Sequence, residues 1–490
     1  MIFHNKLISK SKFMKETFNY YEFLEAGENF TKFIANYFEK LHSQNVLPKR
    51  SFGELIDLFK DDFPKKPENL KNLLKDFEKK ILPFVVHWNH PNFYSYFNST
   101  TNAPGILSEY LTSALNANSM HWDSNPAGVE LEIVVLNWLQ KALGIKEDFF
   151  ALTYDTASLS SFHAMAAARE LKSDWTFRKK GVASRNYSNG IVCYCSELAH
   201  SSIEKNALVL GFGEEGVKKI SVDENFSINT NLLENEIKKD ISLGKVPVCA
   251  VATVGGTALG SVDDLKKIYE ICAKYNIWLH VDAAWAGACA LLPQYSKIFE
   301  AWNFADSIVV NPHKWMFVPF DCSVLFIKNK KALASAFSLT PSYLESSDYN
   351  SINFMDYSLP LGRKFRALKM YFVFKYFGFE GIARFIEDNI ALAKYFANKI
   401  KEDEDFELLE PQNFGLVCFK LNEKTFKDQD LNKKLYAKVN GSGKYFISSA
   451  IFKGQTFLRA SFSSPYQNKK GADQLFEILK RYAKELKNEK

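Results

Sequence analysis

The chain has few cysteines and no long apolar run, and each shortage excludes a class of protein. Its seven cysteines form no C-x-x-C pair and lie mostly inside apolar runs, as reduced buried thiols do. No apolar stretch reaches the roughly 20 residues that a membrane helix needs. The segment MIFHNKLISKSKFMKETF lacks the small-residue cleavage site of a signal peptide and contains no arginine. We therefore predict a cytoplasmic protein that does not enter a membrane.

Glycine, proline and net charge are also scarce. The 490 residues include 23 glycines and 15 prolines, against 43 phenylalanines, 22 tyrosines and 8 tryptophans, which excludes disordered and collagen-like chains. The net charge of +6 is small for this length and is spread along the chain, so nucleic acid is not an expected partner. With 47% hydrophobic residues, the chain can build a large core and has the length of about three domains.

The first ninety residues have a helical pattern. Large apolar residues recur at helical spacing from Phe30 to Leu41, which places them on one helix face, and a second helical stretch follows Pro67. The face can pack on the rest of its own chain, and its many large aromatic residues also permit packing on a partner subunit. The residues alone leave both interpretations open.

From about residue 150, short apolar runs alternate with helical stretches. This alternation predicts a parallel sheet covered by helices on both faces. Catalytic groups in such a sheet lie at the carboxyl ends of the strands. After about residue 370 the pattern indicates a smaller α+β domain. The expected strands of the larger sheet include residues 190–197, 246–256, 277–285, 307–314 and 322–328.

Two histidines and an aspartate permit a metal site. His280 and Asp282 are two residues apart on an expected strand, so they share a face and could both bind a metal ion. His200 or His313 could complete the ligand set, which makes a metal hydrolase one interpretation. In the other, each histidine is a structural residue with its ring nitrogens hydrogen-bonded inside the fold.

Three groups at the ends of expected strands favour a different chemistry. Asp282 ends an apolar strand and is poorly solvated unless it meets a cation. Lys314 follows another strand, beside His313 and Trp315, where desolvation lowers its pKa and makes the amine a nucleophile toward an aldehyde. A helix expected to begin at about Ser158, after small hydroxyl residues, offers free N–H groups to an anion. Together they are what a protein contributes to pyridoxal phosphate chemistry.

The chain also resembles the group II pyridoxal-phosphate-dependent decarboxylases, and especially their aromatic L-amino acid decarboxylase branch. The resemblance is dense from about residue 90 to 375 and thinner on both sides. The matching segments are HPNFYSYFNS (90–99), NPAGVELE (125–132), DTASLSSFHAMAAARE (155–170), AHSSIEK (199–205), ATVGGT (252–257), WLHVDAAWAGACALLP (278–293), ADSIVVNPHKWMFVPFDCSVLFIK (305–328), PSYL (341–344) and LPLGRKFRALKMYFVFK (359–375).

The resemblance implies an α/β protein with the fold of fold-type I pyridoxal-phosphate-dependent transferases. An N-terminal helical segment, residues 1–100, would mediate dimerisation. Residues 101–375 would form the large cofactor-binding α/β domain with a mostly parallel sheet, and residues 376–490 a small α+β domain. The family's active site lies between two identical subunits, so a homodimer is expected, with a small amino acid as substrate and neither nucleic acid nor membrane as a partner.

The resemblance also implies roles for individual residues around pyridoxal 5′-phosphate. Lys314 would hold the cofactor as a Schiff base, and Asp282 would keep the ring nitrogen protonated, so that the ring accepts the electrons left by CO₂ loss. His200 would stack on the ring and touch the substrate. The remaining cofactor contacts would come from Ala157, Ser158, Thr257, Asn311 and His313.

Tyr343 matches a tyrosine that the family carries on a mobile loop, where it returns a proton to the substrate carbon. Closure of such a loop excludes water from the reaction, and opening releases the amine. Relatives that convert their substrate to an aldehyde lack this tyrosine or change the ring-stacking histidine. Because this chain retains both Tyr343 and His200, decarboxylation to an amine is predicted rather than aldehyde synthesis.

The expected substrate is an aromatic L-amino acid such as Dopa, tyrosine, tryptophan, 5-hydroxytryptophan or phenylalanine. No arginine or lysine occurs in YSYFNS or MHWDSNPAG, the segments that match the family's side-chain pocket. Decarboxylation of an acidic or basic amino acid, such as glutamate, cysteine sulfinate or diaminobutyrate, remains the alternative. The resemblance places these residues at the substrate: Tyr96, Phe97, Ser99, Trp122, His200 and Gly362.

Overall fold

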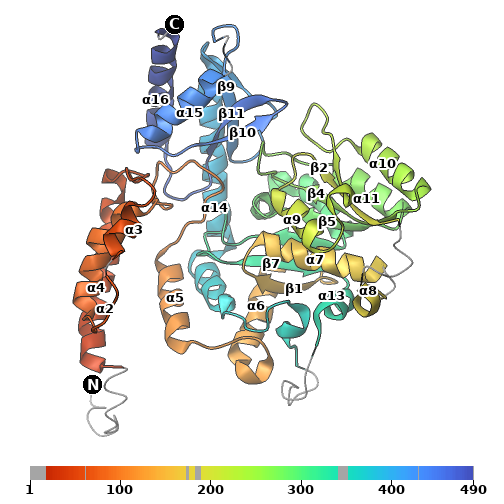
Figure 1. Cartoon of the computed structure of the whole chain (residues 1–490), viewed down its shortest axis with the longest axis horizontal. Helices are drawn as coiled ribbons and strands as arrows, with labels where there is room; N and C mark the ends of the chain where they lie inside the picture. Colours follow the sequence, from red (N-terminus) through yellow and green to blue (C-terminus); the bar gives the residue numbers. More distant parts are fainter. Residues whose placement is uncertain are drawn as a thin grey trace.

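Two β-sheets organise the chain (Figure 1). The computed structural model describes residues 18–60, 62–172, 176–181, 189–339, 351–426, 428 and 430–488. No helix in this described part is long and apolar enough to cross a membrane. The larger sheet has seven strands: β1 (Phe150–Tyr154), β2 (Ile191–Ser196), β3 (Val217–Ile220), β4 (Val246–Thr253), β5 (Trp278–Asp282), β6 (Ser307–Val310) and β7 (Ser323–Ile327).

The larger sheet is mostly parallel, as predicted, but it contains one reversed strand. The strand order is β1-β7-β6-β5-β4-β2-β3, and all neighbours from β3 to β6 run parallel. β7 is antiparallel to both β6 and β1. The prediction of a mostly parallel sheet is therefore confirmed, with β7 as the one reversed strand among the seven described. A parallel neighbour needs a crossover that is usually a helix, whereas the described connection between β6 and β7 contains no helix and leads to an antiparallel pair.

Helices cover both faces of this sheet. On one face α7 (Ala157–Lys172), α9 (Ser201–Val209) and α13 (Lys330–Phe337) pack on the strands through small and apolar side chains. The alanine-rich turns of α7 let this helix lie close to β4, β5, β6 and β7. On the other face lie α6 (Pro126–Ala142), α10 (Thr230–Ser242), α11 (Leu265–Lys274) and the first half of α14 (Arg366–Glu402).

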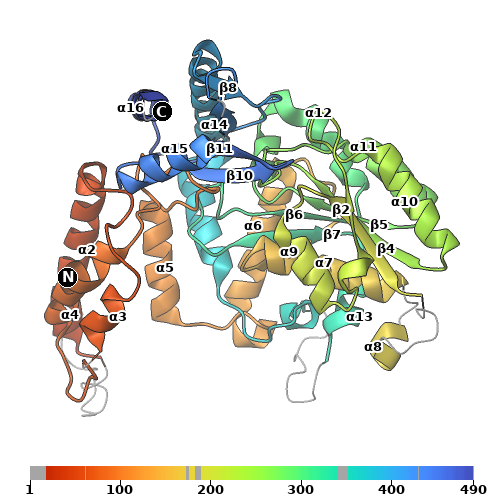
Figure 2. The same ribbon diagram turned by 45° about the horizontal axis from the view of Figure 1, so that its top comes forward.

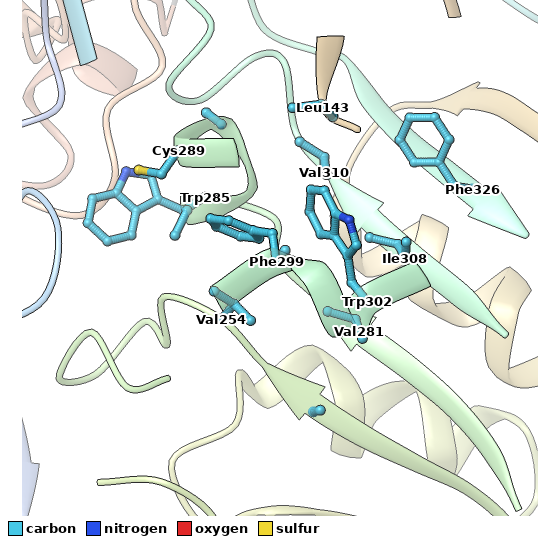
Figure 3. Packing of buried hydrophobic residues seen from close by; sticks show 14 of the residues in the cluster. Leu143, Val254, Val281, Trp285, Cys289, Phe299, Trp302, Ile308, Val310 and Phe326 are labelled. Carbon is cyan, nitrogen blue, oxygen red and sulfur yellow. The ribbon is translucent and has the colours of Figure 1, made fainter. Parts of the chain in front are cut away.

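Alternation along the strands divides the core into two layers, because successive side chains point to opposite faces. Val192 and Tyr194 belong to the layer on the α6 side, and Cys193 and Cys195 to the layer under α7. Figure 3 shows the layer on the α6 side, where Trp302 packs among the apolar side chains of β5 and β6.

The smaller sheet is antiparallel, in the order β10-β11-β9-β8, and lies at one end of the molecule. Its strands are β8 (Phe406–Leu408), β9 (Leu416–Leu421), β10 (Ser448–Phe452) and β11 (Gln455–Ser461). The second half of α14 packs against this sheet, after a break at Gly378, which has φ 64°. The helices α15 (Asp430–Gly441) and α16 (Lys469–Asn488) complete this smaller part. In the larger part, α8 (Thr176–Lys180) and α12 (Ser296–Phe299) are short surface helices.

Three N-terminal helices form an arm beside the rest of the chain (Figure 2). α2 (Tyr20–Lys40), α3 (Glu54–Phe59) and α4 (Leu70–Asp76) contain no buried residue. The face predicted from Phe30 to Leu41 therefore exists, but its own chain covers only part of it: Leu41 is buried, whereas Phe30 and Ile34 stay exposed. The arm lies next to α5 (Ala103–Leu115), whose outer residues are also exposed and apolar.

After the arm, the chain crosses to the small sheet, where the Tyr94 N–H donates to the Phe446 carbonyl at 2.7 Å and the Ser461 N–H donates to the Tyr94 carbonyl at 2.8 Å. The segment around Tyr94 thus packs on the smaller part of the molecule before the chain enters the larger one. The division into units at residues 100 and 375 stays a prediction, which limited proteolysis would test.

Candidate active site

A cavity of about 200 Å³ lies where three strands of the larger sheet end. The loops after β4, β5 and β6 line it, together with the first turns of α7 and α9, which is the position expected for ligands of an open α/β sheet. A larger hollow of about 570 Å³ beside α10 and α11 contains none of the predicted residues. The smaller cavity is lined by all eight residues predicted to bind the cofactor: Ala157, Ser158, His200, Thr257, Asp282, Asn311, His313 and Lys314.

Asp282 is the last residue of β5 and is only 9% exposed. The Ala284 N–H donates to its Oδ1 at 3.1 Å. Thr253, the last residue of β4, is its register partner on the same face, and the Thr253 hydroxyl is buried without a hydrogen-bond partner among the described residues. A buried carboxylate beside an unpartnered hydroxyl needs a cationic or hydrogen-bonding ligand to offset its desolvation.

Lys314 follows β6 in the loop that leads to β7. Its N–H donates to the Asn311 carbonyl at 3.0 Å, which fixes the turn, and its Nζ lies 5.5 Å from the centre of the Phe97 ring. Burial lowers the pKa of Lys314, and the nearby Asp282 offsets this only in part. No ion pair to Lys314 is found in the described part of the chain. More of the amine is therefore neutral than in an ordinary lysine, as a nucleophile toward an aldehyde requires.

His200 caps the N-terminus of α9 and lines the cavity. Its Nδ1 accepts a hydrogen bond from the Ser202 N–H at 3.2 Å and lies 2.8 Å from the Ser202 hydroxyl. These contacts hold the ring in one orientation. Partial burial lowers the pKa of His200, which favours the neutral ring at neutral pH.

The first turn of α7 provides an anion site. The helix begins at Ala157, one residue earlier than predicted, directly after the Thr156 carbonyl, which accepts from the Leu159 and Ser160 N–H groups. The N–H groups of its first turn point out of the helix, at the positive end of its dipole. Asn206, in the middle of α9, donates to the Ser158 carbonyl at 2.8 Å and so ties the start of α7 to α9.

These groups fit pyridoxal 5′-phosphate. The start of α7 offers donors to a phosphate, Asp282 offers a carboxylate to a ring nitrogen, and Lys314 offers an amine to an aldehyde. The Asn311 Oδ1 and Thr253 Oγ1 atoms are buried without partners in the described protein, as expected of groups that serve a ligand.

Three stacked aromatic rings form one wall. The Phe97 and Trp285 rings lie 3.9 Å apart and 8° from parallel, and Trp315 stacks on the far side of Trp285 at 4.6 Å. Both Phe97 and Trp285 line the cavity. Phe97 was expected here from the sequence, whereas Thr253 and Trp285 were missed. The available signal for Thr253 was that it ends an apolar strand, just as Asp282 does.

The other predicted substrate residues lie outside this cavity. Tyr96 is 51% exposed and stacks on Trp88, and Ser99 does not line the cavity either. Trp122 and Gly362 lie in two surface segments that are neighbours in space. A hydrogen bond joins these segments, from the Arg363 N–H to the side chain of Asn118 at 2.9 Å.

Two further candidates remain. Tyr343 lies outside the described residues. His280, the possible metal ligand, is buried with one ring nitrogen 2.8 Å from the Ser307 hydroxyl and the other 3.0 Å from the Ser161 hydroxyl. Both of its nitrogens are therefore occupied by the fold. Within the described ranges no group of three or more acidic, histidine or cysteine side chains could hold a metal ion.

Comparison with known proteins agrees with this chemistry. Residues 53–422 match the pyridoxal-dependent decarboxylase conserved domain. The chain is 34% identical to tyrosine decarboxylase 2 of Arabidopsis thaliana over 478 residues, covering 94% of this chain and 86% of that protein. It is 34% identical to aromatic-L-amino-acid decarboxylase of Sus scrofa, covering 90% and 92%.

Among solved structures, that of an Oryza sativa protein designated TDC, with PLP and tryptamine, superposes with a TM-score of 0.91 at 26% identity and covers 96% of this chain and 99% of that one. The family match spans most of the chain, and the residues of the cavity fit the cofactor of that family. This chain therefore belongs to the pyridoxal-dependent decarboxylase family and is a pyridoxal 5′-phosphate-dependent amino acid decarboxylase.

Proposed function

We propose that this enzyme converts an aromatic L-amino acid to its amine and CO₂. The observation that supports this most directly is the composition of the cavity wall. Phe97 and Trp285 line it with aromatic surface, and among the described residues of the lining only Asp282 and Lys314 carry a charged side chain of the Asp, Glu, Lys or Arg type, both of which would serve the cofactor. The described part of the lining thus includes no arginine that could pair with an acidic side chain. The named substrates of the relatives, tyrosine and aromatic amino acids, are consistent with this choice.

Each residue of the cavity would have its own role toward the cofactor. When bound, pyridoxal 5′-phosphate supplies an electron sink for the electron pair released as CO₂ leaves. The Lys314 amine would hold the cofactor, Asp282 would keep a proton on its ring nitrogen, and His200 would lie against its ring. The α7 start at Ala157 and Ser158 would bind the phosphate.

Thr257 and Asn311 lie close enough to complete the cofactor site, since both line the same cavity. Tyr343 would return the proton to the substrate carbon after CO₂ has left. A phenol suits this role because it can donate a proton to a basic carbon and then recover one from water. The substitution Tyr343→Phe tests it: we expect the product to shift from amine toward aldehyde, with oxygen uptake. An unchanged amine yield would remove Tyr343 from this role.

We further propose that the enzyme works as a homodimer with its site at the subunit interface. The exposed apolar residues of α2 and α5 would then be covered by the second subunit. Trp122 and Gly362, which lie outside the cavity of their own chain, would face the site of the partner. Light scattering on the purified protein tests this, and a monomeric mass at full activity would contradict it.

The seven cysteines are buried and unpaired, which supports a reducing compartment, and we propose the cytoplasm. Recovery of the protein from a secretory compartment with oxidised thiols would contradict this.

The substrate is tested by offering the purified holoenzyme separate aromatic amino acids, together with glutamate, cysteine sulfinate and diaminobutyrate, and by identifying the amine formed. We expect kcat/KM for at least one aromatic amino acid to exceed that for each of the other three by about 100-fold or more, since an unpaired charge in an apolar pocket costs several kcal/mol. Preference for glutamate, cysteine sulfinate or diaminobutyrate would refute the aromatic assignment and leave the reaction type intact.

A further inference from the structure

The His313 ring has a close polar neighbour at each nitrogen. The Cys322 N–H donates to Nδ1 at 2.8 Å, and the side-chain amide of Asn311 lies 3.3 Å from Nε2. Both His313 and Asn311 are almost fully buried and line the cavity. The two contacts together determine where the proton of the ring lies.

A backbone N–H is only a donor, so the Nδ1 atom that faces Cys322 carries no proton. Burial, with Lys314 next in the chain, lowers the pKa of His313 to about 3, so the ring is neutral at neutral pH. A neutral imidazole has one N–H group, which must then be on Nε2. The charged residues that act on this ring are Lys314, Asp321 and Lys369. Asp321, the one acidic group among them, is paired with Arg366 at 2.9 Å.

An Nε2–H group needs an acceptor, and the Asn311 amide can offer one only through its oxygen. The two ends of an amide have the same shape, so the hydrogen-bond partners decide which end is which. As placed, the amide turns Nδ2 toward Nε2 and leaves Oδ1 buried without a partner, and exchanging the two ends removes both mismatches. With Oδ1 turned to the Nε2–H of His313, both polar groups are satisfied, and the NH₂ group of Asn311 becomes a donor on the other side.

We propose that His313 is a positioning residue that acts on the cofactor phosphate through Asn311: its Nε2–H holds Asn311 Oδ1 and thereby presents the Asn311 NH₂ group as a donor to the anion. This inference rests on the proposed phosphate site at the start of α7, which lines the same cavity. It assigns to His313 no contact of its own with the phosphate. A neutral histidine is needed because a protonated ring could no longer accept from Cys322.

The test is a double-mutant cycle on the full chain stripped of cofactor, with binding of pyridoxal 5′-phosphate and of pyridoxal followed by absorbance and tryptophan fluorescence. Loss of a hydrogen bond to a charged group weakens binding by roughly 10- to 150-fold. We expect Asn311→Ala to weaken pyridoxal 5′-phosphate by about that factor and to change pyridoxal less than about threefold. In the Asn311→Ala background, His313→Asn should add less than about twofold.

Two substitutions at His313 separate its two contacts. The His313→Asn side chain keeps an acceptor near the position of Nδ1 and loses the donor at Nε2, so we expect it to weaken pyridoxal 5′-phosphate as Asn311→Ala does. The His313→Gln side chain reaches the position of Nε2 with a donor NH₂, so we expect binding within about threefold of the unaltered protein. Additive losses in the cycle, or failure of His313→Gln to rescue, would show that His313 contacts the phosphate itself and would overturn the proposal.

Asn311→Asp tests the same orientation without altering His313, in case His313→Asn does not fold. The carboxylate can accept from Nε2–H but has no N–H to offer, so pyridoxal 5′-phosphate should bind more weakly than to Asn311→Ala, while pyridoxal binding stays nearly unchanged. Unaltered affinity for pyridoxal 5′-phosphate would contradict the assignment. None of these assays contains an amino acid, so their failure would leave the aromatic substrate proposal standing.

Discussion

The cavity and the N-terminal arm differ in the kind of side chain that each exposes to solvent. Around the cavity, polar groups such as the Thr253 hydroxyl and Asn311 Oδ1 are withdrawn from solvent and have no hydrogen-bond partner among the described residues. On the arm, apolar groups are left in solvent: Tyr21 is 74% exposed and Leu24 51% exposed. Each region costs free energy in an isolated chain. Buried polar groups lose their hydration, and exposed apolar groups gain no stabilisation from burial. A small molecule would complete the cavity, whereas the second subunit of the proposed dimer would cover the arm.

The largest effect is expected at the cavity. Lys314→Ala removes the amine that would hold the cofactor, so turnover should fall at least about 10⁴-fold, as on loss of a covalent catalyst. The borohydride-reducible chromophore should vanish as well. The mass in solution should stay that of the unaltered protein, because the arm is untouched. A reducible adduct in this variant would refute the assignment of Lys314.

A smaller effect on activity, but a large one on assembly, is expected at the arm. Replacing Tyr21 and Leu24 by aspartate puts charges where apolar surface would be buried, and two such side chains contribute about 3–6 kcal/mol to association. We expect the dimer to dissociate at micromolar protein, with activity recovering as the protein concentration rises. Light scattering measures the dissociation of the proposed dimer, and the reaction rate measured at a series of protein concentrations shows the recovery of activity.

The matched control adds the same two charges at exposed polar positions of the same helix, Thr31→Asp with Asn36→Asp. It should leave the mass and the concentration dependence unchanged. If both pairs behave alike, the apolar surface of α2 is not what holds the subunits together.

The third prediction concerns acid stability. Burial lowers the pKa of both His163 and His280 to about 4. His163 donates from Nδ1 to the Leu159 carbonyl at 2.7 Å and accepts the Leu359 N–H at Nε2 at 2.9 Å, so the folded protein holds the neutral ring. The unfolded chain binds a proton near pH 6.5. Stability from these rings is therefore complete above pH 6.5 and is lost as the pH falls from 6.5 through 4.

For one such histidine the loss in unfolding free energy is about 2 kcal/mol between pH 7 and pH 5. His163→Gln, which does not titrate, should reduce the slope of stability with pH by about that amount. Urea unfolding at the two pH values measures it, and an unaltered slope would exclude His163 as a source. The arm variant should keep the full slope, because α2 contains no histidine.

Much of the cavity was predictable because its residues stand where short-range patterns change. Asp282 and Lys314 each follow an apolar run, and Ala157 and Ser158 follow small hydroxyl residues that begin a helix. Apolar runs and helix starts are local properties, so these residues could be placed at strand ends and at a helix start without a structure. The resemblance to a family added the cofactor, which the comparisons confirmed.

Other features depended on contacts between residues far apart in the chain. Thr253 lies beside Asp282 only through the register of β4 with β5, and β7 is placed between β1 and β6, antiparallel to both, by pairing with strands far apart in the chain. The Cys322 N–H reaches His313 Nδ1 only because the connection from β6 to β7 folds back on itself. The amino-acid order by itself determined the strands, the helix starts and the reactive residue types, since these depend on neighbours a few positions away. Only the tertiary structure decided register, hydrogen-bond partners and which apolar faces stay uncovered, because these depend on which distant surfaces meet.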